Sequence, residues 1–179
     1  RFVVYTRTFE ADGDDNDTYL YRYEIATGRT TRPLSADLGG DVFGVPVAVS
    51  GSGRFIVTTR ASIADPVRFP VPDEVVYRLV RVDAASRTST VVTTSAPTPA
   101  TYASPLGDFA VDDSGGLVAF DSRKDEPAEA GVRLWDANTG ATELVSKNLA
   151  GGVPEPFTSV YHAVNISGDG RYVGYSTTA

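Results

Sequence analysis

The feature that most constrains the fold of this chain is an internal repeat. Three segments share a short apolar strand, a tight turn rich in Ser, Gly and Asp, and a second strand of alternating polarity. These segments are residues 47–60, 109–123 and 163–177. Aligned on Gly53, Gly116 and Gly170, they recur at intervals of 63 and 54 residues. Residues 1–5 also match residues 171–175, so the chain contains three repeats plus one duplicated strand.

A second set of segments interleaves with the first, at residues 18–35, 74–94 and 131–146. Each has two alternating strands around a turn. In two of them the turn ends in glycine, Ala26-Thr27-Gly28 and Asn138-Thr139-Gly140, and such turns are typical of hairpins. One full unit is therefore four antiparallel strands, predicted in the middle unit at residues 45–50, 54–60, 74–83 and 88–94. No window shows a helical apolar period, so no long helix is expected.

A four-stranded meander that repeats in this way is typical of a β-propeller blade. The predicted fold class is therefore all-β, with about three four-stranded antiparallel blades plus one extra strand pair. The whole chain, residues 1–179, is expected to form a single repeat region. Its blade-like units are residues 1–44, 45–107, 108–162 and, as a partial unit, 163–179.

Short motifs in the turns and strands resemble those of a known repeat family. Ser167-Gly168-Asp169-Gly170-Arg171 carries the full pattern Ser-x-Asp-Gly-(Arg/Lys), and residues 50–54 have Ser in place of Asp. Residues 113–117 match more loosely, and Trp135-Asp136 resembles the strand-ending Trp-Asp pair of WD repeats. The chain resembles the TolB-like, WD-like β-propeller repeat family over nearly its whole length. This resemblance implies the fold and leaves the function open.

Three blades and a fraction are fewer than the 4–8 blades with which propellers close. Open sheet edges tend to pair with another chain. Three solutions are compatible with the sequence: the chain is an excerpt of a longer propeller, two copies close one ring, or the end strands mediate head-to-tail assembly. The lack of Met and a start within a strand favour the excerpt. We therefore expect part of a larger propeller, or one that is closed by oligomerisation.

Composition argues against several classes of function. The net charge is −7, and 16 Lys and Arg residues are scattered among 23 acidic ones. Binding to a phosphate backbone needs clustered basic residues, so nucleic acid is not an expected partner. No apolar run approaches the roughly 20 residues of a membrane span. The chain has no Cys, which excludes disulfides and thiol chemistry. The lack of Cys and the TolB-like resemblance favour an extracellular or periplasmic location.

The long connections are all predicted to lie at one end of the strands. They are residues 9–17, 36–44, 61–73, 95–107, 124–130 and 147–161, whereas the turns at the other end are short. In repeat folds the face with long loops is usually the binding face. The candidate contact residues there are Arg68, Phe69, Tyr102, Phe157 and Tyr161. An alternative role for Phe69 and Phe157 is to pack their loops onto a blade.

One acidic loop resembles a calcium-binding loop. Asp12, Asp14 and Asn16 place oxygen ligands at alternate positions, as Ca²⁺ requires, and Asp17 follows them. However, Asp17 stands where such loops have Gly, and Tyr23 stands where an EF-hand has Glu. The alternative is a solvated acidic hairpin loop. Calcium is therefore the only candidate cofactor, with no cofactor as the alternative.

Other candidates for chemistry have simpler structural explanations. Asp113-Ser114-Gly115-Gly116 mimics a protease nucleophile motif but aligns with the short turns of the other repeats. His162 is the single His, so it cannot form a His-rich metal site within one chain. It is expected to be a hydrogen-bonded structural residue. Trp135 is expected to pack between blades.

These observations predict a non-catalytic propeller module that acts in protein or ligand interaction, or in assembly, through the long-loop face. One alternative is the propeller portion of a larger hydrolase or polysaccharide lyase. Another is a structural subunit that assembles with itself. The expected partner is a protein, or a second copy that pairs with the open blade edges.

Overall fold

The computed structural model describes residues 1–10, 16–34, 47–63, 74–95, 98–99, 106–122, 131–147, 151 and 163–176. Within these residues all regular structure is β-strand. The first sheet has three strands: β1 (Phe2–Glu10), β2 (Asn16–Glu24) and β3 (Arg29–Thr31). No helix in the described part of the chain is long and apolar enough to cross a membrane.

The second and third sheets each contain a four-stranded antiparallel meander. The second has β4 (Val47–Val49), β5 (Phe55–Ile63), β6 (Glu74–Asp83) and β7 (Thr88–Thr94) in that order. A short strand, β8 (Thr98–Pro99), also pairs with the start of β6, where the sequence predicted a loop. The third has β9 (Leu106–Val111), β10 (Leu117–Ser122), β11 (Gly131–Asp136) and β12 (Thr142–Leu144). The last sheet is the pair β13 (Val164–Ile166) and β14 (Val173–Tyr175).

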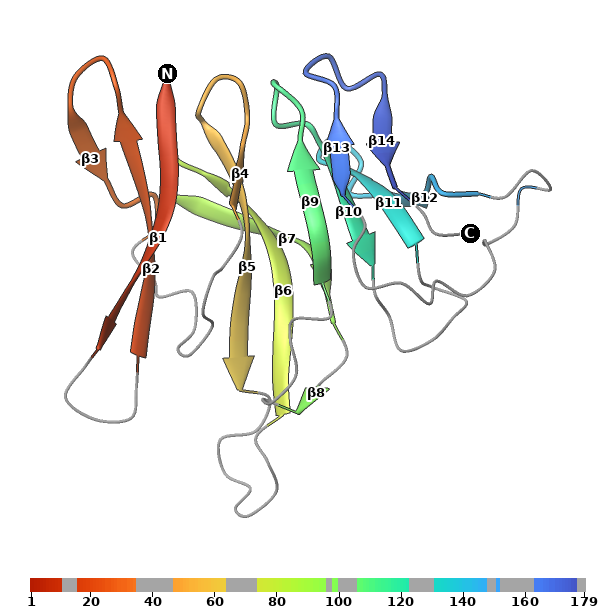
Figure 1. Ribbon diagram of the computed structural model, residues 1–179, viewed down its shortest axis with the longest axis horizontal. Coiled ribbons are helices and arrows are strands. Elements are labelled where there is room, and N and C mark those ends of the chain that lie inside the picture. The colour runs from red at the N-terminus through yellow and green to blue at the C-terminus, as the bar shows by residue number, and fades with distance from the viewer. Residues whose placement is uncertain are drawn as a thin grey trace.

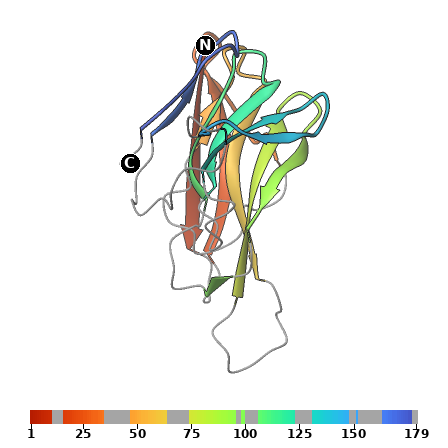
Figure 2. The same cartoon turned by 90° about the vertical axis from the view of Figure 1, so that its right-hand side faces the viewer.

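The four sheets follow one another across the molecule in chain order, from red to blue in Figure 1. The view turned by 90° shows the strands running side by side, with the short hairpin turns gathered toward one end (Figure 2). Successive sheets lie face to face, as blades do in a propeller. The predicted fold class is confirmed: the described residues are all-β, and the sheets they form are propeller blades that do not close a ring.

Alternation along the strands explains why each sheet has two different faces. Val4 of β1 and Leu20 of β2 point toward the second sheet, where Leu20 is fully buried. Val3, next to Val4, and its cross-strand partner Tyr23 lie on the opposite face, because successive residues of a strand point to opposite sides.

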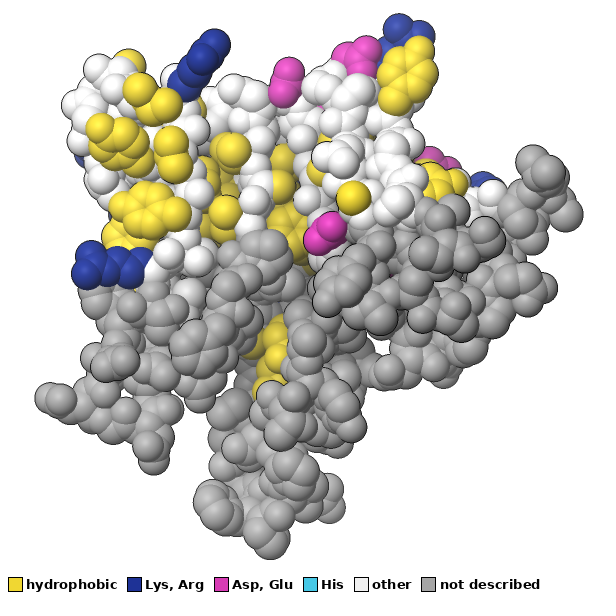
Figure 3. Space-filling view, in the orientation of Figure 1, with side chains coloured by type: hydrophobic (Ala, Val, Ile, Leu, Met, Phe, Trp, Pro, Cys, Tyr) yellow, Lys and Arg dark blue, Asp and Glu magenta, His cyan; other side chains and the backbone are white. Residues whose placement is uncertain are grey.

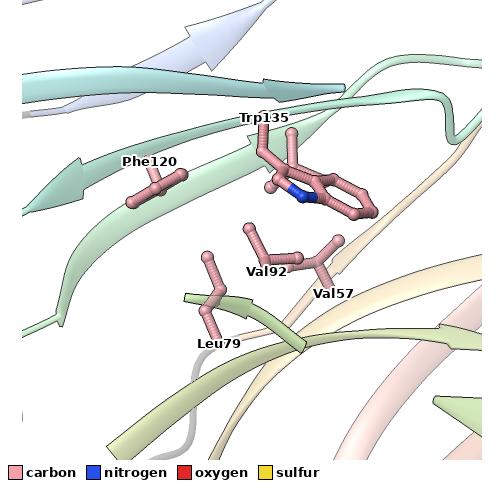
Figure 4. Packing of buried hydrophobic residues seen from close by; sticks show 6 residues of the cluster. Val57, Leu79, Val92, Phe120 and Trp135 are labelled. Carbon is pink, nitrogen blue, oxygen red and sulfur yellow. The ribbon is translucent and has the colours of Figure 1, made fainter. Parts of the chain in front are cut away.

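Three apolar clusters fill the spaces between the sheets. The first joins Leu20 and Leu34 to Ile56, Val80 and Val82 of the second sheet. The second lies between the second and third sheets, where Trp135 contacts residues from both (Figure 4); its buried members are Val57, Leu79, Val92, Val118, Phe120 and Trp135. The third joins Ala119 and Val132 to Val164 of the last pair. The expectation that Trp135 packs between blades is therefore confirmed.

We call residues 50–54, 112–116 and 167–171 the inner turns, since each joins the first two strands of its sheet. In each inner turn one glycine has a positive φ: 68° at Gly53, 73° at Gly115 and 72° at Gly170. Its N–H donates to the carbonyl three residues earlier, at 2.8 to 3.1 Å. The sequence alignment on Gly116 was therefore wrong by one residue. Gly116 occupies the position of Arg54, and the repeat intervals are 62 and 55 residues.

An ion pair links the inner turn of the second sheet to the end of β6. The guanidinium of Arg54 donates two hydrogen bonds to the carboxylate of Asp83, at 3.0 and 2.7 Å. The N–H of Ala85 donates to the same carboxylate at 2.9 Å. The hydrogen bonds from Arg54, more than the N–H of Ala85, hold the pKa of Asp83 well below its usual range.

We expect Asp83→Asn to lower the melting temperature at about pH 7 by about 2 °C or less, since both partners are near the surface. The depressed pKa of Asp83 stabilises the fold above the unfolded pKa of about 4, and this contribution is lost as the pH falls below that value. Melting temperatures of the unmodified chain and of Asp83→Asn at about pH 7 and about pH 3 check this. The difference between the two proteins should shrink at low pH. A difference that grows would contradict a stabilising role for ionised Asp83.

Candidate functional site

The residues predicted to bind on the long-loop face lie outside the described residues. This holds for Arg68, Phe69, Tyr102, Phe157 and Tyr161. The strand ends to which the long connections attach do lie together, opposite the inner turns (Figure 1). The prediction of a binding face at that end therefore stays a prediction.

The candidate calcium ligands are only partly within the described residues. Asp12 and Asp14 lie outside them, whereas Asn16 and Asp17 begin β2 and pair in register with Glu10 and Phe9. His162 also lies outside the described part of the chain. Among the residues that are described, no three His, Cys, Asp or Glu side chains come together as metal ligands would.

The motif that mimics a protease nucleophile forms an inner turn. The hydroxyl of Ser114 donates to the carboxylate of Asp112 and accepts the N–H of Gly116 at 3.0 Å. The other oxygen of Asp112 accepts the N–H of Leu117 at 2.9 Å. In the other two inner turns, Ser50 and Ser167 stand at the position of Asp112 and accept the equivalent N–H. Ser52 and Asp169 stand at the position of Ser114 and accept the N–H two residues later, so Ser114 has a structural role in a repeated turn.

The described residue set with the clearest potential for contact is the outer face of the first sheet. Three cross-strand pairs define it: Val3 with Tyr23, Tyr5 with Tyr21, and Arg7 with Tyr19. Ile25 continues it past the end of β2. We call these seven residues the open face. Figure 3 shows the hydrophobic side chains gathered over this sheet.

The open face is apolar, aromatic and accessible. Val3 is 48% exposed and Ile25 is 54% exposed, and the rings of Tyr5 and Tyr23 are also solvent-exposed. The rings of Tyr5 and Tyr21 stack with their centroids 5.4 Å apart, which fixes both side chains in one orientation. At the edge of the face, the guanidinium of Arg32 lies 3.8 Å from the ring centroid of Tyr19. Rigid aromatic rings beside cationic groups are favourable contact anchors.

The repeat shows what the open face corresponds to in the other sheets. The pair Val3 and Tyr23 aligns with Ile56 and Val82 in the second sheet. It aligns with Val118 and Trp135 in the third. Both of these pairs are buried against the preceding sheet. The open face therefore occupies the positions by which a blade packs onto its neighbour.

Sequence reasoning did not predict the open face as a site. Alternation in β1 and β2 separates two faces without telling which one has a neighbour. The available signal was the match between residues 1–5 and residues 171–175, which places Val3 at the position of Val173. Because Val173 packs against the third sheet, the equivalent valine also belongs to a packing face.

Comparison with known proteins supports the fold alone. No family model and no curated protein matches the chain. Among solved structures, a crystal structure of the tricorn protease matches with a TM-score of 0.52 and 16% identity, covering 89% of this chain and 13% of that one. An oligogalacturonate lyase in complex with manganese matches with a TM-score of 0.42 and 16% identity, covering 78% of this chain and 39% of that one. The chain thus spans much less than two thirds of either, and its likeness to the tricorn protease is one of fold alone.

Proposed function

We propose that this chain is a non-catalytic assembly module of the TolB-like, WD-like propeller type, which uses the open face of β1–β3 as a contact surface. The observation that carries the proposal is the exposure of Val3 and Tyr23, a pair whose equivalents in both following sheets are buried. When another β-sheet covers a surface whose residues are those of a sheet-packing face, the free energy falls. Apolar burial contributes about 25 cal/mol per Å².

The composition of the open face favours a macromolecular partner. Its residues lie on a sheet rather than in a pocket, so they present a broad surface to a partner of similar shape. Sheets pack face to face at about 10 Å, with their side chains interdigitating, and the stacked tyrosines supply such side chains. The module would therefore hold a second copy of itself by sheet-on-sheet packing of the two open faces.

Val3→Glu tests the proposal. We expect it to weaken association through the open face by about tenfold or more, because a carboxylate buried in an apolar interface loses its hydration. Light scattering of the purified chain over a range of concentrations measures this association. The melting temperature at low concentration should hardly change, since exposed positions tolerate substitution.

Val91→Glu is the matched control. Val91 is 49% exposed, against 48% for Val3, and lies on β7 away from the open face. The mass of Val91→Glu should depend on concentration in the same way as the mass of the unmodified chain. Equal masses for all three proteins at every concentration would contradict the proposal, and so would an equal loss of association in both variants.

A further inference from the structure

The inner turns are connected by a contact that repeats from sheet to sheet. In the first step, the ring of Phe2 lies against Gly53 of the second sheet, where a Cβ would overlap the ring. The guanidinium of Arg22 lies 4.3 Å from the ring centroid of Phe2 and donates to the carbonyl of Gly53 at 3.1 Å. Phe2 and Arg22 thus hold the left-handed glycine of the next sheet from two sides.

The second step has the same composition. The ring of Phe55 lies against Gly115 of the third sheet. The guanidinium of Arg81 lies 3.7 Å from the ring centroid of Phe55 and donates to the carbonyl of Gly115. Burial lowers the pKa of Arg81, which is consistent with its enclosure between the two sheets.

The third step keeps the position but changes the residues. Leu117 lies against Gly170, where an added Cβ would come within 2.8 Å of its Cδ1. Leu134 stands at the strand position of Arg22 and Arg81. The first residue of β1, of β5 and of β10 therefore covers the left-handed glycine of the inner turn in the next sheet, whether that residue is Phe or Leu.

A separate contact shows that the inner turns themselves lie next to one another. The N–H of Asp113 donates to the carbonyl of Gly168 at 2.9 Å. The carboxylate of Asp113 fills the space that a side chain at Gly51 or Gly168 would need. The spacing between successive inner turns is thus fixed by backbone contact as well as by the covering side chains.

Tyr172 is the next member of this series. It directly follows the inner turn at residues 167–171. Phe2, Phe55 and Leu117 occupy the equivalent position in the other three sheets. Yet its side chain is 67% exposed. We infer that Tyr172 is a docking residue for one more blade of this repeat, whose inner turn presents a left-handed glycine to the tyrosine ring.

The described residues argue against a second copy of this chain as the occupant. Its left-handed inner-turn glycines are Gly53, Gly115 and Gly170, and all three are already covered by Phe2, Phe55 and Leu117. The occupant must offer an uncovered turn of the same kind, which a further blade of the repeat does. This inference rests on the proposed assembly function but concerns the opposite end of the molecule from the open face.

The test is an extended chain in which a second copy of residues 64–146 follows Ala179. The added residues supply two outer strands for β13–β14 and then a complete sheet with its own inner turn. We expect Tyr172→Ala to lower the melting temperature of the extended chain by about 5 °C or more, as loss of a packed aromatic does. In the chain of 179 residues the same substitution should have no effect, because Tyr172 is exposed there.

A second readout does not depend on stability. The chain has no Cys, so Tyr172→Cys introduces a single reporter thiol. We expect its reaction with a thiol reagent to be about tenfold slower or more in the extended chain. Replacing the copied inner-turn glycine by Val should restore the reactivity. Val91→Cys is the matched control and should react equally in both chains.

Three results would overturn the inference. The first is a Tyr172→Cys thiol that reacts equally fast in both chains. The second is a thiol in the unextended chain that becomes protected as its concentration rises, because the occupant would then be a second copy. The third concerns two chains, the extended chain and a shorter one that ends after the copied residue 122. If neither of them unfolds cooperatively, the inference is wrong. None of these depends on Val3, so the proposed function and this inference fail separately.

Discussion

Gly115→Ala should lower the free energy of unfolding by about 2 to 5 kcal/mol, because two costs combine at this position. Its φ of 73° is unfavourable for any residue with a Cβ. The added Cβ would also overlap the ring of Phe55 from the neighbouring sheet. Relieving the overlap would move Phe55 away from Arg81, which contacts the same ring. Urea unfolding followed by circular dichroism measures the loss.

Gly140→Ala separates the two costs. Gly140 has nearly the same φ, 70°, but an added Cβ would meet no atom within 4 Å. The free energy of unfolding of Gly140→Ala should therefore fall by the backbone cost alone, about 1 to 2 kcal/mol. If both variants lose the same amount, the contact between Phe55 and the inner turn contributes nothing to stability.

Trp135→Ala should have a similarly large effect, a loss of about 3 to 5 kcal/mol, which is typical of removing a buried aromatic side chain. Trp135 is only 4% exposed and lies in the cluster between the second and third sheets (Figure 4). Its removal would leave a cavity beside Val57 and Phe120, since strands on both sides fix the spacing of the sheets.

Trp135 is the single tryptophan, so the unfolding of this variant is best followed by far-ultraviolet circular dichroism. Val91→Ala is the control at an exposed position and should change the free energy of unfolding by about 0.5 kcal/mol or less. A loss below about 1 kcal/mol in Trp135→Ala would show that the two sheets adjust to fill the space, and would contradict close packing at this cluster.

The strands were predictable from the sequence because alternation and turn residues are local signals. β6 and β7 were predicted at residues 74–83 and 88–94, and the structure has them there. β8 was not predicted, since two residues are too few to show alternation. Its pairing with the start of β6 depends on how the chain returns to the sheet, which is a tertiary feature.

The inner turn at residues 112–116 shows where local signals are insufficient. Gly115 and Gly116 are adjacent, and either one satisfies the requirement for glycine in the left-handed region. The position next to the ring of Phe55 is Gly115, and that contact comes from another sheet, 60 residues earlier in the chain. A sequence pattern within one turn cannot contain this information.

The open face was missed for the same reason. The residues of β1 and β2 alternate in the same way as those of β5 and β6, so both faces of each sheet looked alike. Only the order of the sheets in space separates Val3, which is exposed, from its equivalent Ile56, which is buried. The candidate contact residues of the long loops could be predicted from loop length, and they stay predictions.

The three apolar clusters have a consequence for how the chain unfolds. They are arranged in series, and each one is shared by two neighbouring sheets only. A sheet in the middle is stabilised from both sides, whereas a terminal sheet is stabilised from one, as in other linear repeat proteins. Opening should therefore begin at the two terminal sheets, β1–β3 and β13–β14, and travel inward, and amide hydrogens of β5 and β10 should exchange last. The terminal sheets would thus open locally before the whole chain unfolds cooperatively.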